Sequence, residues 1–402
     1  MHRRSFLTLA GAAQLTAQPS AQPPSRPAVR SGYVDWNWQS WREITGESRP
    51  GLTSEQTGKA ALADLVTRNM TAPQWDAKRA EIRRILDVFL GTPPSSKPPL
   101  EAKVTGETTL ADHTRRSVRF QVEPDEFAPA FLLIPKTRRG SMPAVIVPHQ
   151  TTQEGKREPA GLAGNPRLHW ALDLVRRGYV TFTYDAACFG ERHDPSSGHY
   201  GDAIPFYRKH PRWSMLGKMI WDLSRAIDYL ETLGFVDSAR IASAGHSHGG
   251  YTTFVGMALD PRLRAGVSSC GFDTFRYDGN VWRWSHATAL LPRLGFYISS
   301  PHIHMRNYGG VPDSETIQTP FDLHHVLALI APRPLLLTAS DDDNIFPNSG
   351  WSTRQSAAKL EPVYHLLGAR EQLATYYFRG GHGFPPEAQD RAWAWLDRCL
   401  MR

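Results

Sequence analysis

The segment from Arg240 to Tyr251 reads Arg-Ile-Ala-Ser-Ala-Gly-His-Ser-His-Gly-Gly-Tyr and carries the spacing G-x-S-x-G around Ser247. An apolar run precedes this spacing and a helical pattern follows it. Together they predict a sharp strand-to-helix turn that exposes the serine hydroxyl, with Gly245 and Gly249 leaving room for the strained backbone. Ser247 is therefore a candidate nucleophile, and an incidental glycine-rich turn is the less favoured interpretation.

A carboxylate and a histidine follow Ser247 in the order that such a nucleophile needs. Residues 334–347 form an apolar strand that delivers three aspartates to the loop at its carboxyl end. Residues 379–384 place His382 in a glycine-flanked loop between the last predicted strand and the last predicted helix. The histidine would accept the proton of the serine, and a carboxylate would fix its tautomer and stabilise its cation.

These segments resemble the α/β-hydrolase superfamily, and within it the exported bacterial enzymes described as dienelactone-hydrolase-like or acetyl-xylan-esterase-like. The resemblance covers about residues 128–400 and rests on Gly245–Gly250, Ala331-Pro-Arg-Pro-Leu, Asp343-Asn-Ile-Phe-Pro and Gly381-His-Gly. It implies a mostly parallel central sheet with helices on both faces, and a serine esterase that uses no cofactor. Dienelactone hydrolases typically use a cysteine nucleophile, so the serine favours an esterase.

The resemblance also selects the acid. In this family the catalytic aspartate typically lies four residues before a proline, which points to Asp343 and Pro347. The peptidase-like relatives have an Asp-Asp-Asn-Val pattern that would select Asp342 instead. The loop opens with Ser340, where the family usually has glycine, so Asp342 stays the alternative to Asp343.

Two backbone N–H groups must hold the oxyanion that forms during acyl transfer. The residue after the nucleophile, His248, supplies the first. The second is expected in residues 148–151, where the resemblance implies Gln150 or, alternatively, Thr151. Neighbouring histidine side chains are expected to brace this loop (His149) or to pack at the elbow and the rim of the site (His246 and His248).

The elements that position these groups alternate between strand and helix, which predicts an α/β fold with a buried sheet. Two β-rich runs, at 116–122 and 128–134, precede the alternation. Parallel strands are predicted at 144–147, 179–183, 240–244, 265–269, 334–339 and 373–378. Helices are predicted at 71–90, 169–177, 214–233, 249–259, 353–366 and 385–400.

The chain is predicted to divide into a signal and linker (1–30), a helical N-terminal extension (31–99) and an α/β-hydrolase domain (100–402) with an insertion at 271–330. In the extension, the clustered tryptophans Trp36, Trp38 and Trp41 are expected to dock onto the core. The insertion is expected to wall the substrate pocket. Its candidates for stacking on sugar rings or pairing with acidic groups are Trp282, Arg283, Trp284 and Tyr297, and core packing explains the aromatic residues equally well.

The N-terminus resembles a twin-arginine export signal. Arg3 and Arg4 precede Phe6 and Leu7, a weakly apolar stretch and a Pro/Gln-rich segment. This order predicts a periplasmic or secreted protein. The alternative is an ordinary terminus with a chance pair of arginines.

Composition excludes several classes of protein. With 41% hydrophobic and 21% charged residues, the 402-residue chain is neither a disordered polymer nor a fibrous repeat. The sequence contains no apolar stretch of 18 residues, so it predicts no membrane-spanning helix. The lysines and arginines behind the net charge of +7 are scattered, which disfavours a nucleic-acid partner.

Cofactor and metal sites have no support in the sequence either. The three cysteines are too few and too widely spaced for a zinc ribbon or a disulfide framework. His302-Ile-His304 and His324-His325 lack further ligands at metal-binding spacing, so solvated or packing histidines are expected. Cys270 is expected to be a buried small residue. No nucleotide-binding glycine motif is present.

The predicted function is hydrolysis of carboxylic esters through an acyl-enzyme on Ser247, with a short-acyl or carbohydrate ester as the partner molecule. A peptidase of the prolyl-oligopeptidase type would use the same three residues, but too few residues precede the hydrolase strands to form its propeller. A catalytically silent binding protein with this fold is the other alternative. The oligomeric state stays open.

Overall fold

The computed structural model describes residues 38–52, 62–137, 140–194, 200–278, 281–286, 288–298 and 318–401. The predicted signal segment, Trp36 and the motif His302-Ile-His304 lie outside these residues. Twin-arginine export therefore stays a prediction. Within the described residues, no helix is both long enough and apolar enough to span a membrane.

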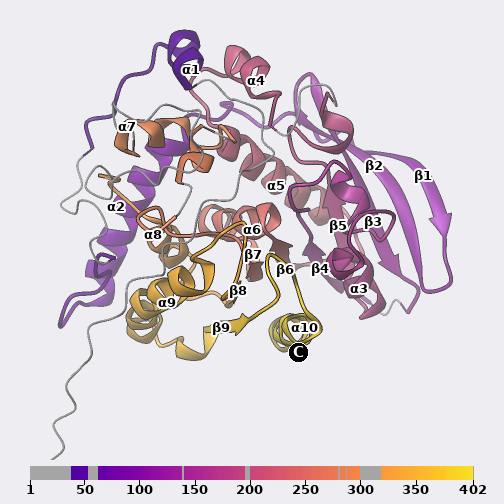
Figure 1. Ribbon diagram of the computed structural model, residues 1–402. Helices are drawn as coiled ribbons and strands as arrows, with labels where there is room; N and C mark the ends of the chain where they lie inside the picture. The colour runs from indigo at the N-terminus through magenta and orange to yellow at the C-terminus, as the bar shows by residue number, and fades with distance from the viewer. Residues whose placement is uncertain are drawn as a thin grey trace, which may run out of the picture.

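The strands of the described residues form one nine-stranded sheet in the order β1-β2-β3-β5-β4-β6-β7-β8-β9 (Figure 1). The pairs β1-β2, β2-β3 and β3-β5 are antiparallel, and all pairs from β5 to β9 are parallel. The prediction of a mostly parallel α/β-hydrolase sheet is therefore confirmed. The bounds are β1 Lys103–Thr109, β2 His113–Glu123, β3 Glu126–Pro135, β4 Met142–Ile146, β5 Val180–Tyr184, β6 Val236–His246, β7 Leu263–Ser269, β8 Leu335–Ser340 and β9 Leu373–Phe378.

Helices cover both faces of this sheet. Alternate residues of β8 enter different cores, with Leu335 and Leu337 in one cluster and Leu336 in the other. Helices α3 and α10 pack on the face of Leu336, and α5, α6 and α9 pack on the opposite face. The bounds are α1 Trp38–Thr45, α2 Ala72–Leu90, α3 Trp170–Arg176, α4 Ala203–Lys209, α5 Met215–Glu231, α6 His248–Leu259, α7 Gly295–Ile298, α8 Leu323–Ala328, α9 Ser349–Leu366 and α10 Pro386–Leu400.

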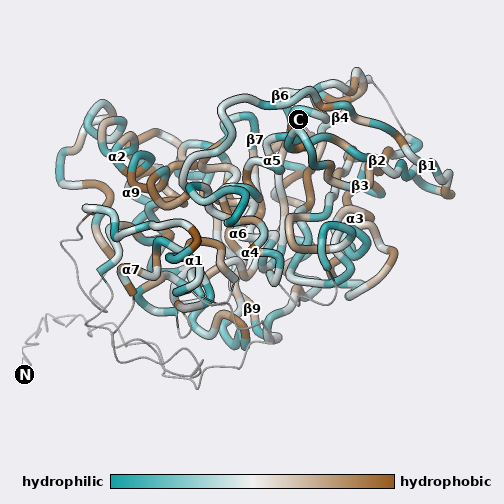
Figure 2. The backbone as a smooth tube through the Cα atoms, turned by 90° about the horizontal axis from the view of Figure 1, so that it is seen from above, coloured by the Kyte–Doolittle hydropathy of each residue, from teal (hydrophilic) through white to brown (hydrophobic). Residues whose placement is uncertain are grey.

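Helix α2 lies at the end of the molecule opposite the edge strands β1 and β2, and α1 contacts α4 (Figure 2). Helix α2 begins after the cap Thr71, whose partner in the capping box is Gln74, and Gly91 follows its last residue with a φ of 77°. In α1, Trp38 and Trp41 are buried, and the indole Nε1 of Trp38 donates to the carbonyl of Pro292 at 2.8 Å. The expected docking of these two tryptophans is confirmed.

The strand order fixes where a site can form. The chain passes from β4 to β5 on one side and then returns to β6 on the other side of β4. Such a switch point leaves a crevice outside the carboxyl ends of the strands, which is where ligands bind in open α/β sheets. The loops that follow β4, β6, β8 and β9 carry Gln150, Ser247, Asp343 and His382. All four residues therefore belong to the same edge of the sheet.

Candidate active site

Ser247 occupies the single residue between β6 and α6 and has φ 55° and ψ −116°, a strained conformation for a residue with a side chain. Its backbone N–H donates to the carbonyl of Ser269 at 2.8 Å. A Cβ on Gly245 would lie 2.4 Å from the backbone of Gly249, and a Cβ on Gly249 would lie 2.2 Å from the carbonyl oxygen of Pro148. Both glycines are therefore required by close backbone approach, as the predicted turn demands.

The loops after β8 and β9 lie side by side because the two strands are adjacent and parallel, with Ser340 opposite Phe378. This register brings Asp343 to His382: the imidazole Nδ1 lies 2.8 Å from Oδ2 and 3.0 Å from Oδ1 of the carboxylate. The other ring nitrogen, Nε2, is buried and has no hydrogen-bond partner among the residues that the structure describes. The ring of His246, the residue before the elbow serine, lies 4.7 Å from the His382 ring.

The pKa of Asp343 reflects two opposing effects. The side chain is fully buried, which by itself would raise the pKa, but the hydrogen bond and charge of His382 hold it below its usual value. The backbone N–H groups of Ile345 and Phe346 each donate to Oδ1 at 2.8 Å and act in the same direction. Asp343 is thus a carboxylate that accepts the Nδ1–H of His382.

The other two aspartates of this loop have different partners. Oδ1 of Asp342 accepts hydrogen bonds from the backbone of Gly380 at 2.8 Å and Gly381 at 3.1 Å, so it supports the loop that carries the histidine. Asp341 forms an ion pair with Arg354 at 2.6 Å. Of the two acids that the sequence left open, Asp343 is the one in contact with His382.

A narrow cavity of ≈ 20 Å³ includes Ser247 in its wall. This volume holds about one water molecule, so the cavity is the floor of a site rather than a pocket for a whole sugar. The ring of Phe346, which also lines it, lies 5.9 Å from the ring of His382. The lining residues are Thr151, Ser247, Tyr251, Arg283, Trp284, Thr288, Leu290, Ile345 and Phe346.

The loop after β4 is held by His149, as expected. Its Nδ1–H donates to the carbonyl of Gln150 at 2.6 Å, and its Nε2 accepts from the backbone N–H of Ala186 at 3.1 Å. Burial lowers the pKa of His149, which keeps the ring neutral in this bracing role. The side chain of Gln150 donates to Glu158, whereas the other predicted oxyanion donor, Thr151, lines the cavity of Ser247.

The histidines on either side of Ser247 are packed, but the expectation that they form the rim of the site is wrong. His246 and His248 are only 3% and 1% exposed. The ring of His248 contacts those of Phe189 and Tyr251, each at 5.0 Å between centroids, so it lies inside an aromatic cluster beneath the surface. Burial lowers the pKa of both histidines, that of His246 to about 3.

The insertion contributes one arginine and one tryptophan to the cavity. Arg283 and Trp284 line it, while Tyr297 turns away and its hydroxyl donates to the carbonyl of Pro50 at 2.7 Å. The side chain of Trp282 lies outside the described residues. Sequence reasoning missed Asp278, which lies within 3.2 Å of both Arg283 and Trp284, because nothing in the local sequence indicates that this acid is buried.

His324, His325 and Cys270 have packing roles. His325 Nδ1 accepts from the backbone of Asp322, and His324 contacts the carbonyl of Ala63, which confirms packing roles for this pair. All three cysteines are free, and Cys270 is buried as predicted. Within the described residues, three potential metal ligands converge only at Cys270, Asp343 and His382, where the acid and the imidazole already bond each other.

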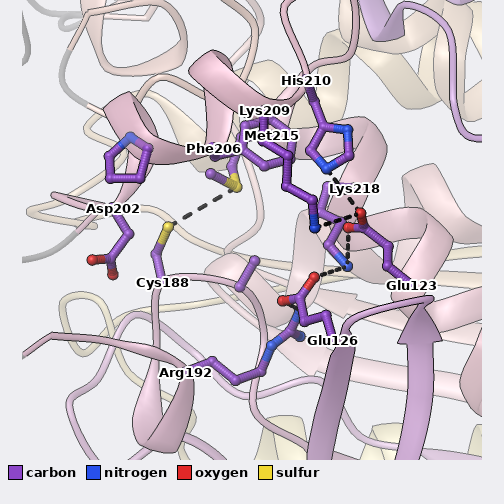
Figure 3. A pocket seen from close by; sticks show the side chains of 12 residues that line it. Glu123, Glu126, Cys188, Arg192, Asp202, Phe206, Lys209, His210, Met215 and Lys218 are labelled. Atoms are coloured by element: carbon purple, nitrogen blue, oxygen red, sulfur yellow. Dashed lines mark hydrogen bonds and ion pairs between the residues drawn. The ribbon is translucent and has the colours of Figure 1, made fainter.

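A second and larger cavity, of ≈ 230 Å³, lies among β2, β3, α4 and α5 (Figure 3). Its lining is strongly charged, but its cations are paired with carboxylates. Lys218 lies 2.9 Å from both Glu123 and Glu126, and Arg192 also pairs with Glu126. No hydroxyl nucleophile is among the described residues that line this cavity, whereas the smaller cavity contains the elbow serine Ser247 and is the candidate active site.

Comparison with known proteins agrees with this geometry. Residues 129–368, more than half of the chain, match the family model described as "Glucuronyl esterase, fungi". The chain belongs to the glucuronyl esterase family. The putative hydrolase YtaP of Bacillus subtilis is 26% identical over 314 residues, which cover 76% of this chain and 94% of that protein. A 4-O-methyl-glucuronoyl methylesterase of Phanerochaete carnosa is 25% identical over 240 residues, 56% of each chain.

A solved glucuronoyl esterase from Solibacter usitatus has the same fold. It superposes with a TM-score of 0.66 at 18% sequence identity, covering 85% of this chain and 98% of that structure. The predictions of an α/β-hydrolase fold and of an enzyme of the serine esterase type are thus confirmed. The family match supports glucuronyl esterases rather than the dienelactone-hydrolase-like or acetyl-xylan-esterase-like branch.

Proposed function

We propose that this protein hydrolyses esters in which a uronic acid supplies the acyl group, with Ser247 as the nucleophile. The observation that carries the proposal is a cavity lined by the elbow serine, beside an Asp343–His382 pair, in a chain whose family match is to glucuronyl esterases. Relatives named 4-O-methyl-glucuronoyl methylesterases support a sugar acid as the acyl part and a small alcohol as the leaving group.

The residues have distinct roles in the proposed reaction. The Oγ of Ser247 attacks the acyl carbon while its proton passes to Nε2 of His382, whose Nδ1–H is held by Asp343. The oxyanion is held by the backbone N–H of His248 and by that of Gln150 or Thr151. The alcohol leaves with the proton from His382. Water then attacks the acyl-enzyme, with His382 again as base, and the uronic acid is released.

The experiment compares hydrolysis of methyl glucuronate with that of p-nitrophenyl acetate, butyrate and octanoate by the full chain. We expect turnover of the glucuronate ester with a kcat/KM above that of the octanoate ester. Ser247→Ala and His382→Ala should each lower kcat by at least about a thousandfold on every substrate, because each removes a member of the reacting pair. A fluorophosphonate probe should label the wild type and not Ser247→Ala.

The matched control is Ser268→Ala, which removes another buried serine, in β7, that does not line the cavity. It should leave turnover within about twofold of wild type, as expected for a hydroxyl with no part in the reaction. Turnover of short p-nitrophenyl esters without any hydrolysis of methyl glucuronate would restrict the function to short-acyl esters. Absence of both turnover and labelling would refute the hydrolase mechanism altogether.

A further inference from the structure

Arg283 has an unusual position for a charged residue. Among the residues that line the cavity of Ser247 in the described part of the chain, it is the only one with a charged side chain. Its residue exposure is 7%, so the guanidinium is largely removed from water. Burying a charge is costly even when it is paired, and an apolar side chain of similar volume is often as stable there. A contribution to folding stability therefore does not by itself explain why an arginine occupies this position.

The guanidinium is fixed in one orientation by its surroundings. Nη2 donates to the carbonyl of Ile345 at 2.6 Å and to Oδ1 of Asp278 at 3.2 Å, and Nε lies 3.2 Å from Oδ2 of Asp278. The group also stacks over the ring of Phe346 at 4.3 Å. An arginine carries five N–H donors on a rigid planar fork, so the same group can hold its supports and bind a ligand oxygen.

Asp278 organises this side of the cavity. Besides Arg283, it accepts a hydrogen bond from the indole Nε1 of Trp284 at 3.2 Å, so one buried carboxylate orients two lining side chains. A second buried acid, Asp273, has a pKa raised well above its usual value by burial and by the nearby Asp278. Burial thus favours the neutral form of Asp273, and Asp278 is the carboxylate that forms the ion pair with Arg283.

The size of the cavity determines which part of a substrate Arg283 can reach. The ≈ 20 Å³ cavity beside Ser247 holds about one water molecule, so Arg283 in its wall can reach only atoms within a bond or two of the reacting carbonyl, and not the far side of a sugar ring. In a uronate ester, the carbon next to the carbonyl carries the ring oxygen. In an alkanoate ester that carbon carries only hydrogen and carbon, so this oxygen is the nearest feature that distinguishes the two kinds of acyl group.

We propose that Arg283 is a specificity-determining residue that donates a hydrogen bond to an oxygen on the carbon next to the ester carbonyl, and that Asp278 is its positioning residue. This inference rests on the proposed hydrolysis at Ser247 and narrows the acyl group that the site prefers. The ligand class is an α-oxygenated acyl group, of which a uronoyl group is one example.

The test uses two p-nitrophenyl esters that differ by one atom, methoxyacetate and butyrate, in which an ether oxygen replaces a methylene. The measured quantity is the ratio of kcat/KM for methoxyacetate to that for butyrate. The wild-type ratio serves as the reference because the α-oxygen also raises intrinsic reactivity. In Arg283→Met the ratio should fall by about ten- to a hundredfold, the effect of losing one hydrogen bond from a charged donor. Asp278→Asn should lower it by a smaller factor.

Arg293→Met is the matched control, because Arg293 lies in the same insertion and is also 7% exposed, but it pairs with Glu47 and does not line the cavity. Its ratio should equal that of the wild type. If Arg283→Met does not fold, as judged by circular dichroism, Arg283→Lys keeps the charge without the planar fork and should still lower the ratio several-fold.

Two contrary outcomes are distinct. A ratio within twofold of wild type in the folded Arg283 variant, with both rates reduced in parallel, would give Arg283 only a structural role at the Ile345 loop and overturn the inference alone. A wild-type protein that hydrolyses neither p-nitrophenyl ester nor methyl glucuronate would overturn the proposed function and the inference together.

Discussion

The three adjacent aspartates after β8 have three different roles, although they differ only by one position in the sequence. Asp341 pairs with Arg354, Asp342 holds the backbone of the β9–α10 loop, and Asp343 contacts His382. All three side chains have the same chemistry, so their roles follow from where the backbone of the loop turns. That turn is fixed in part by the N–H of Phe346, which bonds to Asp343.

We expect Asp343→Asn to lower kcat for p-nitrophenyl acetate by on the order of a thousandfold or more. The amide cannot stabilise the imidazolium that forms on His382, and it can favour the wrong tautomer. Asp342→Asn should cost less than about tenfold, because it weakens only the support of Gly380 and Gly381. Steady-state kinetics of both variants tests which aspartate is the catalytic acid of the triad. A larger loss of kcat in Asp342→Asn would assign that role to Asp342.

At the scale of elements, the pattern of apolar residues predicts all the parallel strands of the described sheet. It also predicts helices α2, α3, α5, α6, α9 and α10. The six predicted parallel strands correspond to β4 through β9, because runs such as Leu335–Leu337 are buried on both faces and read as continuous apolar segments. Strand β1 could not be found in the same way. All seven of its residues, Lys103–Thr109, are exposed, so it carries no alternation and is recognisable only through its pairing with β2.

The candidate site likewise contains residues that the sequence predicts and residues that only the tertiary fold brings together. Ser247, Asp343 and His382 stand in short motifs whose spacing reflects a local turn, so the sequence predicts them. Arg283 was one candidate among several in the insertion, and its support by Asp278 and by the carbonyl of Ile345 joins segments that no local pattern connects. Contacts of this kind depend on the tertiary fold, so they cannot be predicted from a local sequence pattern.

The charged cluster between β2, β3 and α5 gives a prediction about stability. The ammonium of Lys218, 1% exposed, lies 2.9 Å from carboxylates of Glu123 and Glu126 (Figure 3) and 2.8 Å from that of Asp222. Lys218→Met should lower the free energy of unfolding by roughly 3–5 kcal/mol, because it leaves buried carboxylates with one cation fewer. Chemical denaturation measures this loss directly.

Lys209→Met is the control for that variant. Its ammonium also pairs with Glu123, at 3.2 Å, but the side chain is 44% exposed, so solvent screens the pair. The expected loss is below about 1 kcal/mol. Equal losses of unfolding free energy in the two variants would mean that burial of the lysine does not determine how much its ion pairs stabilise the fold.

At the scale of the whole molecule, buried histidines couple stability to pH. In six of those that the structure describes, burial lowers the pKa, which favours the neutral ring in the folded protein. Below pH 6.5 the unfolded chain binds protons that the folded chain does not, and stability falls as the pH falls. The six are His149, His246, His248, His286, His324 and His325, with pKa values of about 3 for His246 and His286 and about 4 for His325.

A smaller set of acids works in the opposite direction. Burial raises the pKa of four carboxyl groups, so below neutral pH they bind protons in the folded state before the unfolded chain does, and they stabilise it there. These are Glu158, Asp173, Asp273 and Asp322, the last with a pKa of about 6. The histidines outnumber them, so the unfolded state has the net proton uptake between pH 6.5 and about 5.

We therefore expect the Tm of the full chain to fall by several degrees from pH 7 to pH 5.5, at roughly 1.4 kcal/mol per pH unit for each net proton taken up on unfolding. His286→Phe should make the dependence shallower by about one proton, because it removes a buried ring while an aromatic contact with Trp38 can be kept. The exposed His365 is the control, and His365→Phe should leave the slope unchanged. Calorimetry at a series of pH values measures all three slopes. A flat profile in the wild type would contradict a net uptake of protons on unfolding in this pH range.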